Sequence, residues 1–382
     1  MEALERAHRI LDDVTDRVLA DVPEGAVIFD AHTHLGDDID GMRGRPDEML
    51  AMFDRVGITG SFTFCLDEPD RVPAFSAAND RTLAYAAEAP DRIVPFVRLD
   101  LADDPIAEAN RCLDLGARGI KLHPRAQGFS LGDRRLDDVF AVAVERDVPI
   151  LIHGGRGLPP IGDHLAALVD RFADVRLIIA HAGIADLGGL AGHFANVPGV
   201  FFDTSVWSIV DLLDLMRQVA PQQILFATDY PYGRMPNALL LALRSARLAH
   251  FDETEIRGML GTTAQAIATG APLPALTAPK GPEAITHSMP LARIHQYIGM
   301  ATPLMWMRLP DSGGLGLALN AAHEANVDGV PDAPLIRQAL SAAAELWSGI
   351  GQIEDRQESE RIARPARMLV HVADILAVST PA

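Results

Sequence analysis

Eight short apolar segments recur through the first 230 residues of this chain, and five of them run into histidine, lysine or aspartate. The five motifs are Asp30-Ala-His32-Thr-His34, Ile120-Lys121-Leu-His123-Pro124, Leu151-Ile-His153-Gly, Ile179-Ala-His181-Ala-Gly183 and Phe226-Ala-Thr228-Asp229-Tyr-Pro231. Apolar runs without alternation are typical of parallel strands that are buried on both faces. In a (β/α)8 barrel, polar side chains at the carboxyl ends of the strands build the active site. The pattern therefore predicts an enzyme built on a barrel.

Segments with helical periodicity separate these apolar runs, as expected for right-handed strand–helix–strand crossovers. The expected strands are residues 27–32, 58–66, 93–99, 119–123, 149–153, 175–181, 199–204 and 223–229. The expected helices are residues 47–56, 77–88, 104–115, 136–146, 163–172, 209–219, 237–249 and 252–268. A doubly wound open sheet is the competing architecture, but no G-x-G-x-x-G loop follows any of these strands. We therefore predict an α/β fold, a (β/α)8 TIM-type barrel with a C-terminal helical extension.

Three segments are expected along the chain. Residues 1–26 carry a helical pattern and are predicted to form an N-terminal helical arm laid against the barrel, which spans 27–270. A proline-rich linker follows Gly270, and the alanine- and leucine-rich patterns after it predict a helical extension over 271–382. The apolar stretch 300–307 would be costly to leave in water, so we expect the barrel or a second subunit to cover it. A homodimer is the expected assembly.

Composition excludes several classes of partner. The net charge of −19 would repel a polyanionic nucleic acid. Two cysteines, Cys65 and Cys112, are too few for a disulfide framework and are expected to be small buried thiols. The first residues lack a signal-peptide pattern, and no stretch approaches the roughly 20 apolar residues of a membrane helix. We expect a soluble cytoplasmic protein without nucleic-acid or membrane partners.

The histidines at the strand ends indicate a metal site. His32 and His34 are two residues apart on one strand, so their side chains leave the same face and can bind one ion. His153, His181 and Asp229 each end another expected strand, and nitrogen and oxygen ligands suit Zn2+ or a similar divalent ion. The other histidines follow no strand and are expected to be ordinary core or surface residues: His8, His164, His193, His250, His287, His295, His323 and His371.

Lys121 is one of only two lysines among the 33 basic residues. Its amine could bind a substrate carboxylate, or be carboxylated and bridge two metals; a packed stem with a solvated head is the alternative. His123 faces the same way and would share the pocket. Arg125 and Arg156 follow two of the strands and could clamp an anionic substrate group, although a solvated loop arginine is at least as common.

The ordered motifs resemble the amidohydrolase superfamily, in the branch that includes aminocarboxymuconate-semialdehyde decarboxylase and the resorcylate decarboxylases. The resemblance runs from about Ile28 to Gly270. It implies that His32 and His34 bind one metal ion together with His153 and Asp229. From the ligand types we expect Zn2+ first and Mn2+ second. It also implies that Asp229 contacts the metal-bound water, while His181 stays free to polarise the substrate or move protons.

Three functions remain open at this point. The first is a metal-dependent hydrolase of a small, possibly anionic substrate, in which Asp229 is the general base and His181 stabilises the oxyanion. The second is a non-oxidative decarboxylase of an aromatic or muconate-type acid, which would use the same residues. The third is a non-catalytic barrel acting as a binding module, which the intact polar residues at the strand ends argue against.

Overall fold

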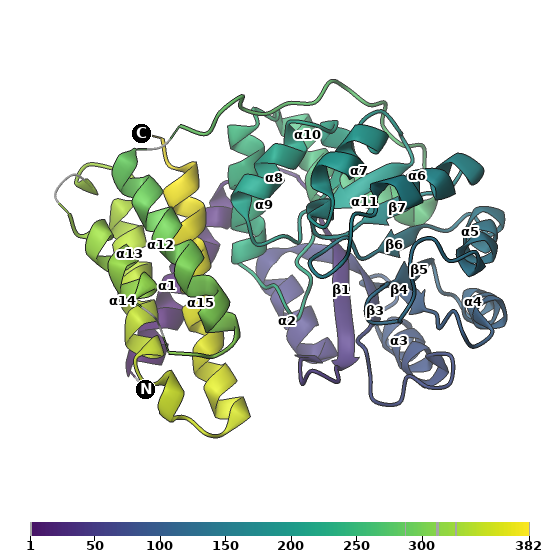
Figure 1. The fold of residues 1–382 in the computed structure, drawn as a ribbon, viewed down its shortest axis with the longest axis horizontal. Coiled ribbons are helices and arrows are strands. Elements are labelled where there is room, and N and C mark those ends of the chain that lie inside the picture. The colour runs from purple at the N-terminus through teal and green to yellow at the C-terminus, as the bar shows by residue number, and fades with distance from the viewer. Residues whose placement is uncertain (1, 287, 311–312, 325–326, 382) are drawn as a thin grey trace.

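The computed structural model describes residues 2–286, 288–310, 313–324 and 327–381, and its larger part is a barrel of parallel strands (Figure 1). Within these residues, eight parallel strands follow one another in chain order. They are β1 (Ile28–Asp37), β3 (Ile58–Cys65), β4 (Ile93–Arg98), β5 (Gly119–Leu122), β6 (Ile150–Ile152), β7 (Leu177–Ile179), β8 (Val200–Asp203) and β9 (Ile224–Leu225). A short strand, β2 (Arg43–Gly44), pairs antiparallel with the end of β1. All eight expected strands are confirmed.

The barrel closes because the chain after β9 returns to β1. The backbone N–H of Ala31 donates to the carbonyl of Phe226 at 2.9 Å, and that of His34 donates to Tyr230 at 2.7 Å. In the opposite direction, the N–H of Asp229 donates to the carbonyl of His32 at 2.9 Å. These bonds complete the parallel ring, so the predicted TIM-type barrel is confirmed.

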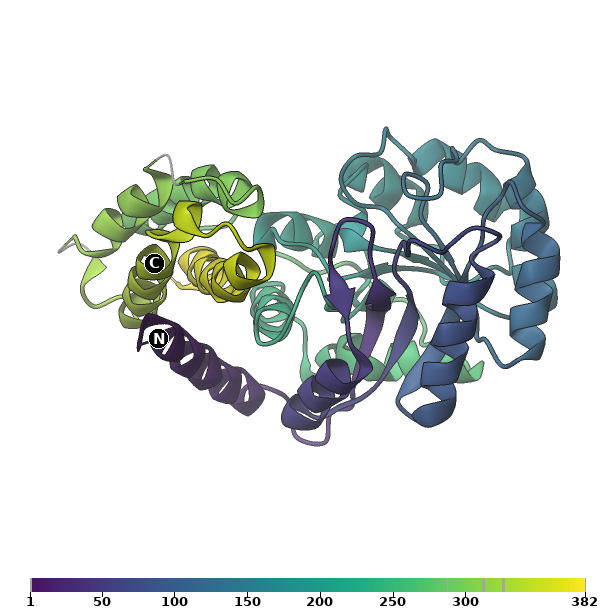
Figure 2. The ribbon, with the colours of Figure 1, turned by 90° about the horizontal axis from the view of Figure 1, so that it is seen from below.

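Helices cover the outer face of the barrel (Figures 1 and 2). They are α2 (Pro46–Val56), α3 (Ser76–Glu88), α4 (Pro105–Asp114), α5 (Arg135–Glu145), α6 (Gly162–Arg171), α7 (Leu187–Phe194), α8 (Ile209–Met216) and α9 (Asn237–Leu248). The expected helix 252–268 is instead divided into α10 (Glu253–Arg257), a π-helical turn (Gly258–Thr262) and α11 (Thr263–Thr269). The sequence did not predict α7, because its three glycines weaken the helical pattern.

Five helices form a separate layer beside the barrel. Four come from the extension: α12 (Met289–Trp306), α13 (Gly314–Ala322), α14 (Ala333–Trp347) and α15 (Arg356–Ser379). The fifth is α1 (Glu2–Ala20), which lies against α14 and α15 and touches the barrel at α9 (Figure 2). We predicted that this helix would lie against the barrel, and that prediction is wrong for its main packing partner. The apolar stripe of the helix faces the C-terminal helices.

The extension is docked onto the barrel through α15 and α14. The Nδ2 of Asn237, at the start of α9, donates to the carbonyl of Met368 on α15 at 2.8 Å. Arg244 of α9 forms an ion pair with Asp332 at 3.0 Å, just before α14. Buried side chains of the barrel helices, α1 and the extension form one continuous apolar cluster. The two layers therefore share a core.

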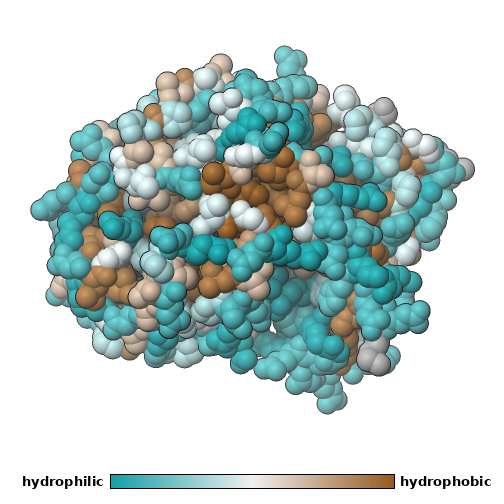
Figure 3. All heavy atoms as spheres, turned by 180° about the vertical axis from the view of Figure 1, so that it is seen from behind, coloured by the Kyte–Doolittle hydropathy of each residue, from teal (hydrophilic) through white to brown (hydrophobic). Residues whose placement is uncertain are grey.

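The apolar stretch 300–307 is only partly covered. Met305 is buried, but Met300 is 51% and Met307 59% exposed. Figure 3 shows apolar patches on the mainly hydrophilic rear surface of the molecule. The expectation that the barrel would cover the whole stretch is wrong, and cover by a second subunit stays a prediction. Within the described residues, no helix is long and apolar enough to cross a membrane.

The shared core predicts one cooperative unfolding transition for barrel and extension together. Leu369 on α15 is fully buried, so Leu369→Ala should lower the free energy of unfolding by about 2–5 kcal/mol. The control is Leu317→Ala at an exposed site, which should change it by less than about 0.5 kcal/mol. Thermal unfolding followed by tryptophan fluorescence and circular dichroism checks this. Two separate transitions in the wild type would contradict the shared core.

Candidate active site

Three of the predicted ligand residues converge where the barrel closes. His32 and His34 project from the same face of β1, and their Nε2 atoms are 3.1 Å apart. The Oδ1 of Asp229 lies 3.2 Å from the first and 3.1 Å from the second. Asp229 adopts a left-handed backbone conformation with φ of 58°, uncommon for a residue with a side chain, just after the last strand. This bend turns its carboxylate toward the two imidazoles.

The protonation of this cluster suits a cation. The Nδ1 of His32 is 2.7 Å from the Oδ2 of Asp203, so Nδ1 carries the proton and Nε2 presents its lone pair to the cluster. Burial lowers the pKa of His32 and of His34 well below the usual value, and burial raises that of Asp229. Two neutral imidazole nitrogens and one carboxylate oxygen form a donor set that fits a divalent ion such as Zn2+.

Asp203 holds two of the histidines in place, and the sequence analysis missed it. Its Oδ2 accepts the proton of His32, and its Oδ1 accepts from the backbone N–H of His181 at 2.8 Å. The same Oδ1 also accepts from the N–H and the hydroxyl of Ser205, at 3.0 and 2.5 Å. Asp203 ends β8, so the rule that selected the other strand-end residues would have found it.

The remaining histidines form a second group beside the first. The Nδ1 of His181 is 2.9 Å from the carbonyl of Ser205, so this nitrogen is a donor and Nε2 is an acceptor. The Nδ1 of His153, 3.0 Å away, must then donate to that Nε2, which leaves the Nε2 of His153 with a free lone pair. His123 stacks on His153 with ring centroids 3.8 Å apart. His153 therefore offers a ligand atom, but it lies outside the three-residue cluster.

Lys121 is fully buried against the metal-ligand candidates. Its Nζ is 3.3 Å from the Nε2 of His32 and 4.5 Å from the ring centroid of Phe64. Burial lowers the pKa of this amine to about 7. Phe64 also packs against the rings of His32 and His34, so the polar cluster rests on an aromatic floor. The alternative of a solvated lysine head is not what the structure shows.

The two loop arginines that the sequence suggested are exposed, whereas a third arginine, Arg98, is buried next to the site. Arg125 and Arg156 are exposed and do not line the cavity beside Asp229 that is described below, so their substrate role stays a prediction. Arg98 is 2% exposed at the end of β4, next to Lys121 in the strand register. Its Nε and Nη2 have no hydrogen-bond partner within the described part of the chain. It ends an expected strand, which was the available signal.

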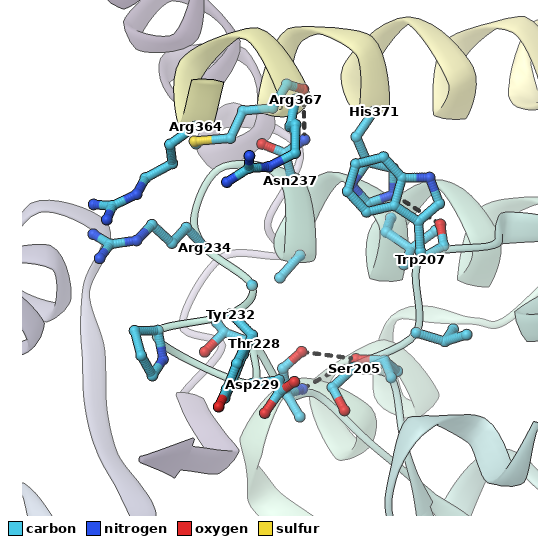
Figure 4. Close-up of a pocket in the computed structure, with 18 of the residues that line it drawn as sticks. Ser205, Trp207, Thr228, Asp229, Tyr232, Arg234, Asn237, Arg364, Arg367 and His371 are labelled. Atoms are coloured by element: carbon cyan, nitrogen blue, oxygen red, sulfur yellow. Dashed lines mark hydrogen bonds between the residues drawn. The ribbon is translucent and has the colours of Figure 1, made fainter. Parts of the chain in front are cut away.

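A cavity of about 170 Å³ opens beside Asp229 and Ser205, between the barrel and the extension (Figure 4). By the same measure a single water needs only about 10–15 Å³, so the cavity has room for a small organic molecule. Its walls include Trp207 and Arg234 from the barrel loops, and Arg364, Arg367, Met368 and His371 from α15.

His371 was expected to be an ordinary residue, but it forms part of this wall. Its ring stacks on Trp207 with centroids 3.9 Å apart, and its Nε2–H donates to the Trp207 carbonyl at 2.8 Å. Burial lowers its pKa to about 4, so the ring is neutral near pH 7. Among the other histidines assigned ordinary roles, His287 lies outside the described residues.

Known proteins resemble this chain in sequence pattern and in fold. The family described as amidohydrolase matches residues 29–267. The solved structure of 2,6-dihydroxybenzoate decarboxylase from Rhizobium is 18% identical, covers 65% of this chain and 99% of its own, and has a TM-score of 0.51. IDCase from Metarhizium anisopliae is 17% identical, with coverages of 64% and 97% and a TM-score of 0.51. At such low sequence identity, the similarity to these structures shows the fold of this chain alone. No curated protein matches the chain.

The position of Asp203 predicts that it sets the tautomer of His32. In Asp203→Asn, an amide can accept only at its oxygen, so its NH2 group faces either the His32 ring or the His181 backbone. The first arrangement moves the His32 proton to Nε2 and removes a ligand lone pair. We expect Zn2+ affinity to fall about 10- to 100-fold, measured by competition with a chromophoric chelator. Exposed Asp54→Asn is the control, and unchanged affinity in Asp203→Asn would refute this role.

Proposed function

The chain belongs to the amidohydrolase family, and from this premise we propose that it is a metal-dependent hydrolase of a small anionic substrate. The observation that carries the proposal is the convergence of His32, His34 and Asp229, with ligand atoms 3.1–3.2 Å apart, beside a cavity. A buried carboxylate and two neutral imidazoles at such distances are costly to keep without a cation between them. A non-catalytic binding module has no need for this arrangement.

We assign one divalent ion to this cluster, Zn2+ first and Mn2+ second. His32, His34 and Asp229 would hold it, and the free Nε2 of His153 is the fourth ligand in this proposal. When bound, such an ion lowers the pKa of water and polarises a substrate oxygen. Lys121 stands beside the Nε2 of His32, where a carboxylated amine would become a ligand for a second ion.

The proposed proton movements use two residues of the chain. The carboxylate of Asp229 belongs to the ligand cluster and also lines the cavity, so it can reach both the proposed ion and an attacking water. Asp229 takes a proton from the attacking water and gives it to the leaving group as the scissile bond breaks. The carbonyl of Ser205 holds His181 at Nδ1, and the Nε2 of His181 accepts from His153. In this proposal the substrate displaces the bond from His153, and His181, protonated at Nε2 by solvent, stabilises the developing oxyanion. Lys121 and His123 are proposed to contact the substrate.

Non-oxidative decarboxylation is the second candidate. It is favoured by the aromatic wall of Trp207, Trp306 and His371, which suits a flat aromatic acid. The solved structures with a similar fold include a decarboxylase of 2,6-dihydroxybenzoate. In this reaction the bond between the ring carbon and the carboxylate breaks, its electron pair stays on the ring, and Asp229 or His181 supplies the proton that replaces CO2.

Isotope analysis separates the candidates. The protein, supplied with Zn2+ or Mn2+, is incubated in H2¹⁸O with carboxylated lactones, N-acyl amino acids and 2,6-dihydroxybenzoate. Hydrolysis places ¹⁸O in the product, whereas decarboxylation releases CO2 from the acid and leaves the other oxygens unlabelled. The proposal expects labelled product that is lost in His32→Ala. Release of CO2 alone supports the second candidate, and no turnover with any probe favours the binding module.

The ligand set predicts close to one equivalent of bound transition metal. Elemental analysis of purified protein should find Zn2+ or Mn2+ near a ratio of one, and His32→Ala should lose it because a donor atom is missing. Absence of transition metal, with no activity gained on adding it, would refute the metal site. A ratio near two would instead make Lys121 a bridging ligand and end the single-metal assignment.

The two proton carriers should differ in metal retention. Asp229→Asn should reduce turnover by about 10²- to 10⁴-fold and weaken metal binding, because it removes both a ligand and a base. His181→Asn should reduce turnover similarly but keep its metal. Turnover and metal content are measured on the same preparations, with His32→Ala as the reference for metal loss. Equal metal loss in His181→Asn and His32→Ala would contradict this division of roles.

A further inference from the structure

Two arginines from distant parts of the chain meet at one end of the cavity. Arg234 lies on the loop between β9 and α9, and Arg364 lies on α15. Figure 4 shows their guanidinium groups next to each other, with Asp229 below them on the barrel side. The first arginine comes from the barrel and the second from the extension, so this end of the cavity exists only when the two are docked.

Arg234 is largely buried and poorly satisfied. Its side chain is 18% exposed, and its Nε and Nη2 have no hydrogen-bond partner among the residues that the structure describes. The nearest ion-pair contact is Glu48, 3.5 Å from Nη2, and that carboxylate is mostly in solvent. The ring of Tyr230 supports the guanidinium at 5.0 Å. Buried guanidinium donors are normally paired, so Arg234 has donors available for a ligand.

Arg364 adds a second charge that Glu360 neutralises only weakly. The Nε of Arg364 is 3.6 Å from Glu360, whose two oxygens already accept from Arg367 at 2.5 Å and from Arg308 at 2.8 Å. Burial, and next the charge of Arg364, lower the pKa of Arg234. Two like charges held together in a partly buried site repel each other, and an anion between them would remove that repulsion.

Two tryptophans and His371 give the cavity wall an aromatic part. Trp207 and Trp306 meet edge to face with centroids 5.7 Å apart, and His371 stacks on the first of them. Arg367 lies over the ring of Trp306 at 4.7 Å and is paired with Glu360 at 2.5 Å, so its charge is already neutralised. A ligand along this wall would gain contact with flat apolar surfaces while its charged end reaches the arginines.

We propose that Arg234 and Arg364 together bind an anionic group, carboxylate or phosphate, on a substrate whose apolar or aromatic body lies along the wall of Trp207 and Trp306. Guanidinium groups match such anions with paired hydrogen bonds. This inference rests on the proposed function, because it assumes that the substrate bond to be broken lies at Asp229. It makes the extension part of the substrate site, since Arg364 lies outside the 29–267 match to the family.

Binding of small probes to the full-length protein, as purified with its metal, tests the subsite. The probes are benzoate, phenyl phosphate and the neutral benzamide, and quenching of the tryptophans in the cavity wall reports binding. Wild type should bind at least one anion about tenfold or more tightly than benzamide. Arg364→Met and Arg234→Met should each remove most of that preference without changing benzamide binding. The stronger of the two anions identifies carboxylate or phosphate as the group recognised.

Arg361→Met is the matched control, because Arg361 lies on the same helix but pairs with Glu358 and does not line the cavity. It should keep the full preference. Arg364→Lys keeps the charge but loses the planar fork, and should fall between wild type and Arg364→Met. Thermal shifts add a readout that a purely structural role of Arg364 would not give. Without ligand, Arg364→Met should melt no lower than wild type. The preferred anion should raise the melting temperature of Arg364→Met less than it raises that of wild type. If Arg364→Met melts at a lower temperature than wild type, the test relies on Arg364→Lys instead. An anion preference in Arg364→Lys equal to that of wild type would then overturn the proposal.

The outcomes distinguish this inference from the proposed function. Equal binding of the anions and benzamide in wild type, or an anion preference unchanged in Arg364→Met, would overturn the subsite whatever the reaction proves to be. An arginine-dependent preference in a protein that turns over none of the isotope-labelling probes would leave the subsite standing and refute the hydrolase. Turnover of an anionic substrate with unchanged kcat/KM in both arginine variants would refute the subsite alone.

Discussion

The closure of the barrel is the constraint on which the site depends. Asp30, fully buried near the start of β1, accepts from the backbone N–H and the hydroxyl of Thr228 at 3.0 and 2.6 Å. It also accepts from the N–H of His32 at 3.1 Å, so one carboxylate fastens the returning chain to the strand that carries the histidines. Burial raises its pKa to about 7, although the hydrogen bonds from Thr228 and His32 act in the opposite direction. Without this fastening, Asp229 would have no reason to hold its left-handed bend and face the imidazoles.

Desolvation, rather than any single contact, sets the protonation states of the polar cluster. The aromatic floor around Phe64 excludes water from beneath His32 and Lys121, so burial lowers the pKa of the imidazole and of the amine. The same burial raises the pKa of Asp229. Each of these pKa shifts favours the uncharged form of the residue. A divalent ion among the donors would favour the ionised form of the carboxylate, and it would bind the lone pairs of the neutral imidazole nitrogens. The cluster is therefore suited to a cation.

The sequence predicted the strands and most of the site because buried parallel strands are continuous apolar runs and end in polar residues at one face of the barrel. Asp203 and Arg98 obey that rule too, since they are the last residues of β8 and β4. Arg234, Arg364 and His371 are different. They lie on a loop and a helix with no strand pattern, and their meeting depends on how the extension docks, which no local periodicity encodes. The same reason explains why α1 packs on the C-terminal helices.

Docking also explains how one helix comes to line the cavity. Residues 360, 364, 367, 368 and 371 of α15 all face it, and their spacing of three and four residues is that of one helical stripe. The bond from Asn237 to the carbonyl of Met368 fixes the position of that stripe against α9. Because α9 starts shortly after the loop that carries Asp229 and Arg234, the same contact relates the charged stripe to the candidate metal ligands. The barrel supplies the candidate metal ligands at its strand ends, and the docked helical layer supplies the charged and aromatic wall that faces them.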